Sequence, residues 1–203
     1  MTNSDLKDVL GVALGASGRP SSDYDLNPEI VLPTERRLRD AAVLIPVVDR
    51  PSGPGVILTK RSSALKYHPG QIAFPGGKVE DHDTNCTATA LREAQEEIAL
   101  GFADVAVIGE LPPHETVTGF QVTPVLAIVT SDFAPDPDTS EVAEVFEVPF
   151  AHVMNLEFYR VESRLWRGQR RYYFTVPWGP FYIWGATARI LRALADRMAN
   201  AKA

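Results

Sequence analysis

Apolar side chains recur at helical spacing in three segments of the chain. These are residues 4–13, 84–99 and 184–198, and each predicts a helix with one apolar face. Residues 14–35 are rich in Gly, Ser, Pro and Asn, which is typical of a loop. The helices are therefore expected near the two ends of the chain and once in its interior.

Shorter apolar runs predict strands. The run AAVLIPVV at residues 41–48 suits a strand buried on both faces, although Pro46 favours a bulge or a sheet edge. The turn sequence PSGPG follows, and a second strand begins at Val56, which predicts a hairpin. Because strands dominate, the pattern favours an α/β sandwich built on a mixed sheet. Further strand-like segments lie at residues 71–74, 105–109, 122–129, 144–148, 158–165 and 171–175.

The interior helix has candidate residues at both ends. Asp83 or Thr84 is suited to cap its N-terminus, because a side-chain oxygen there accepts a hydrogen bond from a free backbone amide. Gly101 is suited to end the helix, because glycine adopts the left-handed backbone of a helix terminus at little cost.

The composition is that of one soluble domain. The chain has 203 residues, of which 45% are hydrophobic and 23% charged, with a net charge of −6 and a pI near 5.2. This acidic balance argues against a nucleic-acid binder. Cys86 is the only cysteine, which excludes an internal disulfide and a thiolate-rich zinc site. Neither a secretory leader nor a membrane-spanning run is evident, so we expect a cytoplasmic protein without a membrane partner.

The interior helix carries the most informative charges. Glu93 and Glu97 lie one helical turn apart, and Glu96 lies beside them on the same flank. Carboxylates at this spacing repel one another, and a hard divalent cation with oxygen ligands removes that penalty. Glu-rich helices are also common as solvated faces, so the cluster indicates a metal site only in a suitable context.

A glycine pair upstream of the helix supplies that context. Gly76 and Gly77 follow Phe74-Pro75, and the absence of side chains lets backbone groups approach a metal or a phosphate there. A glycine pair alone predicts only a turn. Followed through an acidic loop by the three carboxylates, it predicts a site for a divalent ion and a phosphate group.

On these residues, the stretch from Gly77 to Leu100 resembles the Nudix box, G-x5-E-x7-R-E-U-x-E-E-x-G-U, where U is aliphatic. The interval from glycine to arginine is one residue longer than in that pattern, which puts Asp83 near the place of the first Glu, and Ala99 replaces the last Gly. The resemblance implies a Nudix-type α/β/α sandwich with a mixed β-sheet over residues 36–203, preceded by an extension over residues 1–35. The matching positions are Gly77, Arg92, Glu93, Ala94, Glu96, Glu97 and Leu100.

A further stretch resembles the signature of the coenzyme A pyrophosphatase subfamily, L-L-T-x-R-(S/A)-x3-R-x3-G-x3-F-P-G-G. Residues 57–62, Lys66, Gly70 and residues 74–77 follow its spacing. Lys66 stands where the signature has Arg, which keeps the charge but loses the bidentate fork. This resemblance implies a hydrolase that cuts coenzyme A or its derivatives into 3′,5′-ADP and 4′-phosphopantetheine.

The resemblance also implies roles for the charged helix. Glu93 and Glu97 would ligate Mg²⁺ or Mn²⁺, and Glu96 would be a further ligand or the general base. Arg92 would orient a glutamate and not touch the substrate.

Roles are implied for the segment before the helix as well. Gly76 or Gly77 would offer a backbone oxygen to the metal, and Arg61 and Lys66 would contact phosphates of the substrate.

A carboxylate from a later loop is the other candidate for the general base. Glu141 and Glu144 are the residues in question, although each is also a typical surface glutamate. His114 could lie at the mouth of the site, but a lone loop histidine is usually a surface residue.

Two other functions stay open. One is a Nudix hydrolase for another substrate, such as ADP-ribose, a dinucleoside polyphosphate or a damaged nucleotide. The other is a non-catalytic ligand-binding module on the same fold, which is expected to have lost helix carboxylates that this chain retains. The sequence leaves open whether the protein is a monomer or a homodimer, and whether free, oxidised or acylated coenzyme A is preferred.

Overall fold

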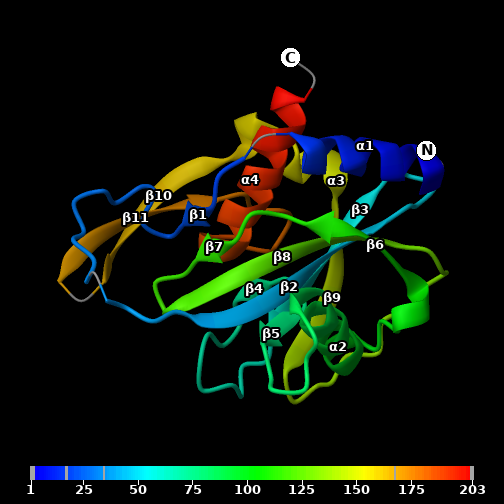
Figure 1. The fold of residues 1–203 in the computed structure, drawn as a ribbon, viewed down its shortest axis with the longest axis horizontal. Coiled ribbons are helices and arrows are strands. Elements are labelled where there is room, and N and C mark those ends of the chain that lie inside the picture. The colour runs from blue at the N-terminus through cyan, green and yellow to red at the C-terminus, as the bar shows by residue number, and fades with distance from the viewer. Residues whose placement is uncertain (1–2, 17, 34, 167, 202–203) are drawn as a thin grey trace.

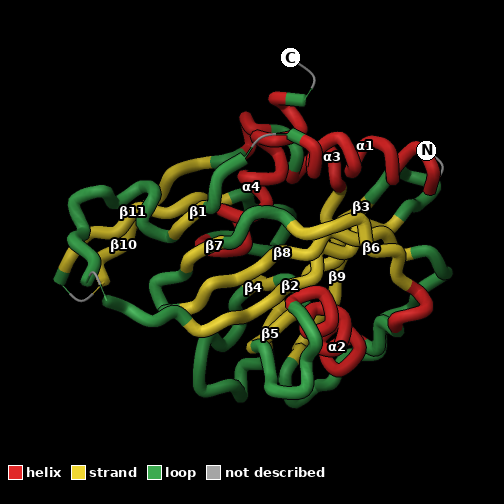
Figure 2. Tube along the Cα trace, in the orientation of Figure 1, coloured by secondary structure: helices red, strands yellow, loops and turns green. Residues whose placement is uncertain are grey.

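A mixed sheet with helices on both faces forms the centre of the molecule (Figure 1). α2 (Cys86–Ile98) covers one face, whereas α1 (Asn3–Gly15) and α4 (Gly185–Asn200) cover the other (Figure 2). The predicted α/β/α sandwich is therefore confirmed. None of the described helices is long and apolar enough to cross a bilayer. This computed structural model describes residues 3–16, 18–33, 35–166 and 168–201.

The sheet has nine strands, in the order β1-β7-β8-β2-β3-β4, with β5 also paired to β2, β6 to β8 and β9 to β3. β10 and β11 form a separate antiparallel hairpin. Each predicted strand is present, whereas the short strands β1, β5 and β7 were not predicted. The strands are β1 (Ser21–Ser22), β2 (Arg39–Val48), β3 (Gly55–Arg61), β4 (Ile72–Ala73), β5 (Gly76–Lys78), β6 (Val105–Glu110), β7 (His114–Glu115), β8 (Phe120–Val129), β9 (Val142–Pro149), β10 (Arg160–Trp166) and β11 (Gln169–Thr175). Short helical turns lie at α3 (Phe150–Val153), Phe102–Asp104 and Leu156–Phe158.

Pro46 lies in the central strand β2, where a bulge or an edge was expected. Successive backbone amides of a strand point to opposite sides, and the amide of Leu44 donates to the Pro75 carbonyl on the β5 side. The backbone nitrogen of Pro46 points to the same side. Residues 41–43 of β2 pair with β5 there and residues 47–48 pair with β3, so Pro46 lies between the two pairings. The missing N–H of proline therefore interrupts neither ladder.

Side chains of alternating residues divide the core into two layers. Under α2, Leu44 of β2 packs in a cluster with Ala94 and Ile98 of the helix. On the opposite face, Ile45 packs in a larger cluster that includes Leu6 of α1, which is 0% exposed. The N-terminal helix therefore shares the core of the main sheet, and the boundary predicted at residue 35 remains a prediction.

The two ends of α2 differ from the prediction. Asn85 is the N-terminal cap, and its side-chain oxygen accepts from the Ala88 amide at 2.8 Å, in place of Asp83 or Thr84. At the other end Ala99 has the left-handed backbone, with φ of 59° and ψ of 25°, whereas Gly101 has φ of −70°. The left-handed residue comes two positions earlier than predicted because Leu100 must turn into the core, where it is 0% exposed.

The left-handed Ala99 gives a stability prediction. An L-residue with a Cβ atom pays about 1 kcal/mol for this backbone, and glycine does not. We expect Ala99→Gly to raise the free energy of unfolding by about 0.5–1 kcal/mol, measured by urea denaturation. The matched control Ala88→Gly, inside the same helix, should lower it by about 1 kcal/mol. Equal losses in both variants would contradict the prediction.

Candidate active site

Glu97 is a carboxylate buried at the junction of α2 and β5. Its side chain is 5% exposed, and its Oε2 atom accepts a hydrogen bond from the Gly76 amide at 3.2 Å. The nearest guanidinium, Nη1 of Arg61, is 3.9 Å from Oε1. Burial raises the pKa of Glu97 to about 8, although the bond from Gly76 opposes that shift. The site thus holds an acid that only a nearby positive charge would keep ionised at neutral pH.

Glu93 lies one turn earlier on α2, against the glycine pair. A Cβ atom added to Gly77 would overlap the carboxylate of Glu93, so a side chain at position 77 would displace this carboxylate from the backbone. Burial raises the pKa of Glu93, and the Arg92 guanidinium, 3.1 Å away, opposes the shift. Glu93 and Glu97 therefore flank the same two glycines, as the i, i+4 spacing predicted.

Arg92 and Asp83 form a clamp between the acidic loop and α2. Nε and Nη2 of Arg92 each donate to Asp83 at 3.0 Å, and the Asp83 side chain is 3% exposed. Asp83 also accepts from the Thr89 hydroxyl. The Arg92 hydrogen bonds hold the pKa of Asp83 well below its usual range. Asp83 lies near the place of the first glutamate of the Nudix box. Its carboxylate is therefore occupied by Arg92 and Thr89, and not by Glu97.

The same arginine reaches two helix carboxylates. Nη1 of Arg92 contacts Glu93 at 3.1 Å and Glu96 at 2.9 Å, and Nη2 donates to the Lys78 carbonyl. Glu96 differs from its neighbours because its side chain is 59% exposed. Arg92 is thus placed to orient Glu93 through a direct hydrogen bond, and Glu96 lies at the solvent side of the cluster.

The residues fit a divalent cation with oxygen ligands. The carboxylates of Glu97 and Glu93 approach Gly76 and Gly77 from α2, and the absence of a Cβ atom on each glycine lets the backbone come close. Within the described ranges, no set of three or more His, Cys, Asp or Glu side chains forms a complete metal site. An ion here would therefore complete its shell with backbone carbonyls, water and phosphate oxygens, as Mg²⁺ commonly does.

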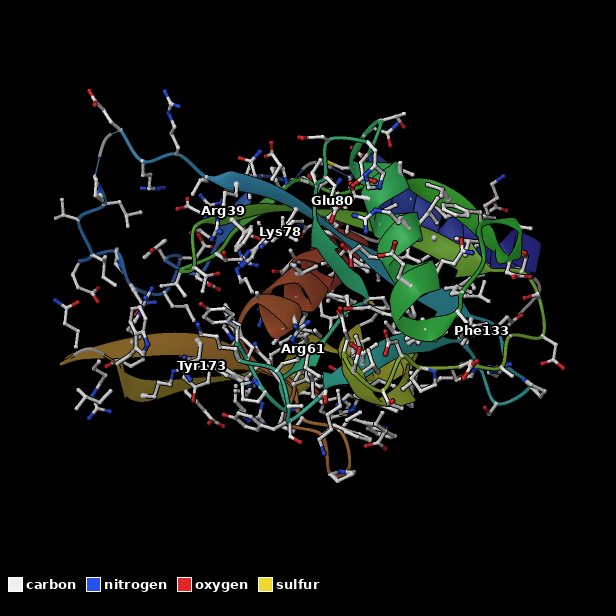
Figure 3. All side chains as sticks on the ribbon, turned by 90° about the horizontal axis from the view of Figure 1, so that it is seen from below. Arg39, Arg61, Lys78, Glu80, Phe133 and Tyr173 are labelled. Carbon is white, nitrogen blue, oxygen red and sulfur yellow. The ribbon has the colours of Figure 1, made fainter. Side chains whose placement is uncertain are left out.

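A cavity of about 870 Å³ borders the glycine pair on the other face of β5. Its floor is the apolar surface of β2 and β8, and Trp166 of the β10–β11 hairpin contributes to its opposite wall. Figure 3 labels Arg39 and Lys78 close to each other, with Arg61 apart from them on the side of the hairpin that carries Tyr173. The volume is sufficient for a ligand much larger than a phosphate ion.

The two predicted phosphate contacts are placed differently. Arg61, at the end of β3, lines the cavity and is near Glu97. Lys66 is exposed, its Nζ atom lies 5.4 Å from the centre of the Tyr67 ring, and it is absent from the described lining of the cavity. Arg39 and Lys78 also line it. They were missed because Arg39 lies outside both motifs, and Lys78 occupies a position of the Nudix box at which the pattern specifies no residue.

Glu144, predicted as a catalytic residue, does not join the cluster. After a register shift beside Val142, the side chains of β9 alternate from Glu144 onwards, and Phe146 and Val148 belong to the core layer under α4. Glu144 has the same parity and is exposed on that face, whereas α2 covers the opposite face. Its loop neighbour Glu141 is the closer candidate, since its charge helps to raise the pKa of both Glu93 and Glu97.

His114 is a structural residue and not one at the surface. It is 0% exposed, its Nδ1 atom is 2.9 Å from the Ser21 hydroxyl, and its Nε2 atom is 3.2 Å from Asp23. These contacts join the short parallel pair of β1 and β7. A two-residue strand leaves no signal in the sequence, so the burial of His114 could not be predicted from it.

The raised pKa of Glu97 gives a pH prediction for the metal-free protein. Between its usual pKa of 4.5 and about 8, the folded state binds a proton that the unfolded state has released. Stability should therefore fall as pH rises through this window, by on the order of a few kcal/mol. Urea titrations at several pH values in EDTA measure the slope. Glu97→Gln should remove most of it, and the exposed Glu96→Gln should leave it; an unchanged slope in Glu97→Gln would contradict the assignment.

The sequence of the chain is similar to those of known proteins. A family model for the NUDIX domain matches residues 38–172. The "Uncharacterized Nudix hydrolase NudL" of Cronobacter sakazakii is 48% identical over 157 residues, which are 77% of this chain and 81% of that protein. The protein of the same name from Escherichia coli (strain K12) is 46% identical over the same shares.

Two solved structures align with part of the chain. A Nudix hydrolase from M. smegmatis, RenU, aligns with a TM-score of 0.49 at 24% identity and covers 57% of this chain and 73% of that one. A C. elegans Ap4A hydrolase binary complex aligns with a TM-score of 0.48 at 16% identity and covers 55% and 80%.

Proposed function

We propose that the chain, which belongs to the Nudix hydrolase family, cuts the diphosphate linkage of coenzyme A or one of its derivatives. Members of this family hydrolyse pyrophosphate bonds and generally use divalent metal ions. The observation that carries the choice of substrate is the segment from Ile57 to Gly77. It follows the spacing of the coenzyme A pyrophosphatase signature, and its Arg61, Gly76 and Gly77 line the large cavity, with Arg61 also 3.9 Å from Glu97.

The proposed chemistry assigns a task to each group near the glycines. Glu93 and Glu97 would hold Mg²⁺ or Mn²⁺ together with a backbone oxygen of the glycine pair, and such an ion would supply positive charge opposite the diphosphate. Arg61 binds a phosphate oxygen, and Arg92 keeps Glu93 in position. Water adds to one phosphorus while the other phosphate leaves, which yields 3′,5′-ADP and 4′-phosphopantetheine.

A carboxylate must accept the proton of the attacking water. We propose Glu141 for this role in place of Glu144, because Glu141 interacts electrostatically with both Glu93 and Glu97. Glu141→Gln is expected to lower kcat by about 10²–10⁴-fold, the usual contribution of a general base. The matched variant Glu144→Gln, on the other face of β9, should stay within about twofold. The reverse ranking in steady-state assays would assign the proton to Glu144.

The substrate is tested with a panel at fixed Mg²⁺ or Mn²⁺. Coenzyme A, ADP-ribose and a dinucleoside polyphosphate are compared by kcat/KM, with products identified by mass spectrometry. We expect coenzyme A to give 3′,5′-ADP and 4′-phosphopantetheine and to be the preferred substrate. A preference of tenfold or more for ADP-ribose would overturn the proposal and leave the family unchanged.

A further inference from the structure

Three basic residues line the large cavity without an acidic one. Arg39, Arg61 and Lys78 are in its wall, and its described lining contains no Asp or Glu. The whole chain has a net charge of −6, so this lining departs from the general balance. Such a concentration of positive charge in a cleft favours an anionic ligand.

Strand geometry directs two of these cations onto the floor of the cavity. Arg39 has the same parity in β2 as Ala41 and Val43, which also line the cavity. Lys78 pairs with Ala41 across β2 and β5. The missing Cβ of Gly77 would point at Glu93, so the side chain of the next residue, Lys78, points away from α2 and towards the cavity.

Both cations lack an acidic partner among the residues described. Arg39 donates to the Thr118 carbonyl at 3.3 Å and lies 4.0 Å from the centre of the Phe120 ring, which holds its guanidinium over the floor. By contrast, Arg36 in the preceding loop is paired with Glu115 at 2.6 Å. The two cavity cations are therefore available to a ligand.

The position of this pair separates it from the reacting groups. Glu93 and Glu97 approach Gly76 and Gly77, whereas Lys78 is the next residue and Arg39 lies further along the floor. A step of two residues along a strand is about 7 Å, comparable with one ribose unit and its substituents. An anion bound here would be a second group of the substrate and not the diphosphate.

We infer that Arg39 and Lys78 form a subsite for a second phosphate of the substrate, which in coenzyme A is the 3′-phosphate of the ribose. The inference rests on the proposed function, because it assigns the part of that substrate that the subsite recognises. It makes these two residues, and not Lys66, the determinants that distinguish coenzyme A from its form without the 3′-phosphate.

The first test compares kcat/KM for coenzyme A and 3′-dephospho-coenzyme A. The wild type should prefer coenzyme A by about tenfold or more, the effect of a lost charged hydrogen bond. Arg39→Gln and Lys78→Gln should each reduce that ratio several-fold, because kcat/KM should fall for coenzyme A and stay unchanged for 3′-dephospho-coenzyme A. The exposed Arg37→Gln is the matched control and should keep the wild-type ratio. Equal use of both substrates by the wild type, or an unchanged ratio in both variants, would overturn the inference.

The second test needs no turnover and separates the inference from the proposed function. Calorimetric titration measures the Kd of 3′,5′-ADP and of 5′-AMP, which differ only in the 3′-phosphate. We expect 3′,5′-ADP to bind about tenfold more tightly, and Arg39→Gln and Lys78→Gln to remove most of the difference. Equal binding of the two nucleotides would reject the subsite even if coenzyme A is hydrolysed. A clear difference without hydrolysis of coenzyme A would reject the substrate and keep the subsite.

Discussion

Glu97→Gln is expected to lower metal-dependent kcat by about 10³-fold or more while the protein remains folded. The carboxylate is 5% exposed and approaches the glycine pair, where a neutral amide cannot replace its charge towards a divalent ion. Charge stabilisation by a metal ion amounts to several kcal/mol, and each 1.4 kcal/mol is about tenfold in rate. Steady-state turnover of coenzyme A at saturating Mg²⁺ measures the effect.

A measurement of thermal stability distinguishes a variant that has lost its metal ion from one that has lost its fold. The amide oxygen of glutamine can still accept from the Gly76 backbone, and the variant no longer buries an acid. Metal-free Glu97→Gln should therefore melt at or above the wild-type temperature at pH 8. Glu157→Gln, an exposed surface change, should keep full activity. Wild-type turnover in Glu97→Gln would remove this residue from the metal site.

Asp83→Asn is expected to have the largest effect on stability. The side chain is 3% exposed and accepts two hydrogen bonds from Arg92 and one from Thr89. Asparagine cannot accept from both guanidinium nitrogens, so a nearly buried cation loses its main partner. We expect the free energy of unfolding to fall by about 2–4 kcal/mol at pH 7, measured by urea denaturation.

The pH dependence gives a second readout of the same clamp. Because Arg92 depresses the pKa of Asp83, its contribution is present above the usual value of 3.8 and is lost as pH falls below it. Asp83→Asn should therefore cost less at pH 2–3 than at pH 7, because the rest of this contribution is lost only as pH falls through the lowered pKa of the folded state. Asp81→Asn, an exposed change in the same loop, should be neutral at both pH values. A loss below about 0.5 kcal/mol in Asp83→Asn at pH 7 would show that the clamp is weak.

Local periodicity predicted the elements that carry the site. The spacing of Glu93 and Glu97 placed both on one flank of a helix, and the structure has them beside the same glycines. Long apolar runs such as residues 41–48 and 122–129 are strands because burial on both faces leaves a continuous signal. These features depend on neighbours within a few residues, which the sequence displays directly.

Features that depend on long-range pairing were not predictable in the same way. Lys78 and Arg39 line the same cavity because β5 pairs with β2, and neither residue type is specified by the motifs or the apolar periodicity. Glu144 was chosen without assigning a face to β9, and a change of one residue reverses the face. Ala99 takes the left-handed turn because the burial of Leu100 determines where α2 ends.

The central claim is that Glu93 and Glu97 hold a divalent ion beside Gly76 and Gly77. A crystal soaked in Mn²⁺ tests it directly, because anomalous scattering locates the ion without reference to activity. The claim predicts a peak about 2.0–2.5 Å from an oxygen of each glutamate and from a backbone carbonyl of the glycine pair. A peak elsewhere, or none beside these carboxylates at saturating Mn²⁺, would contradict it.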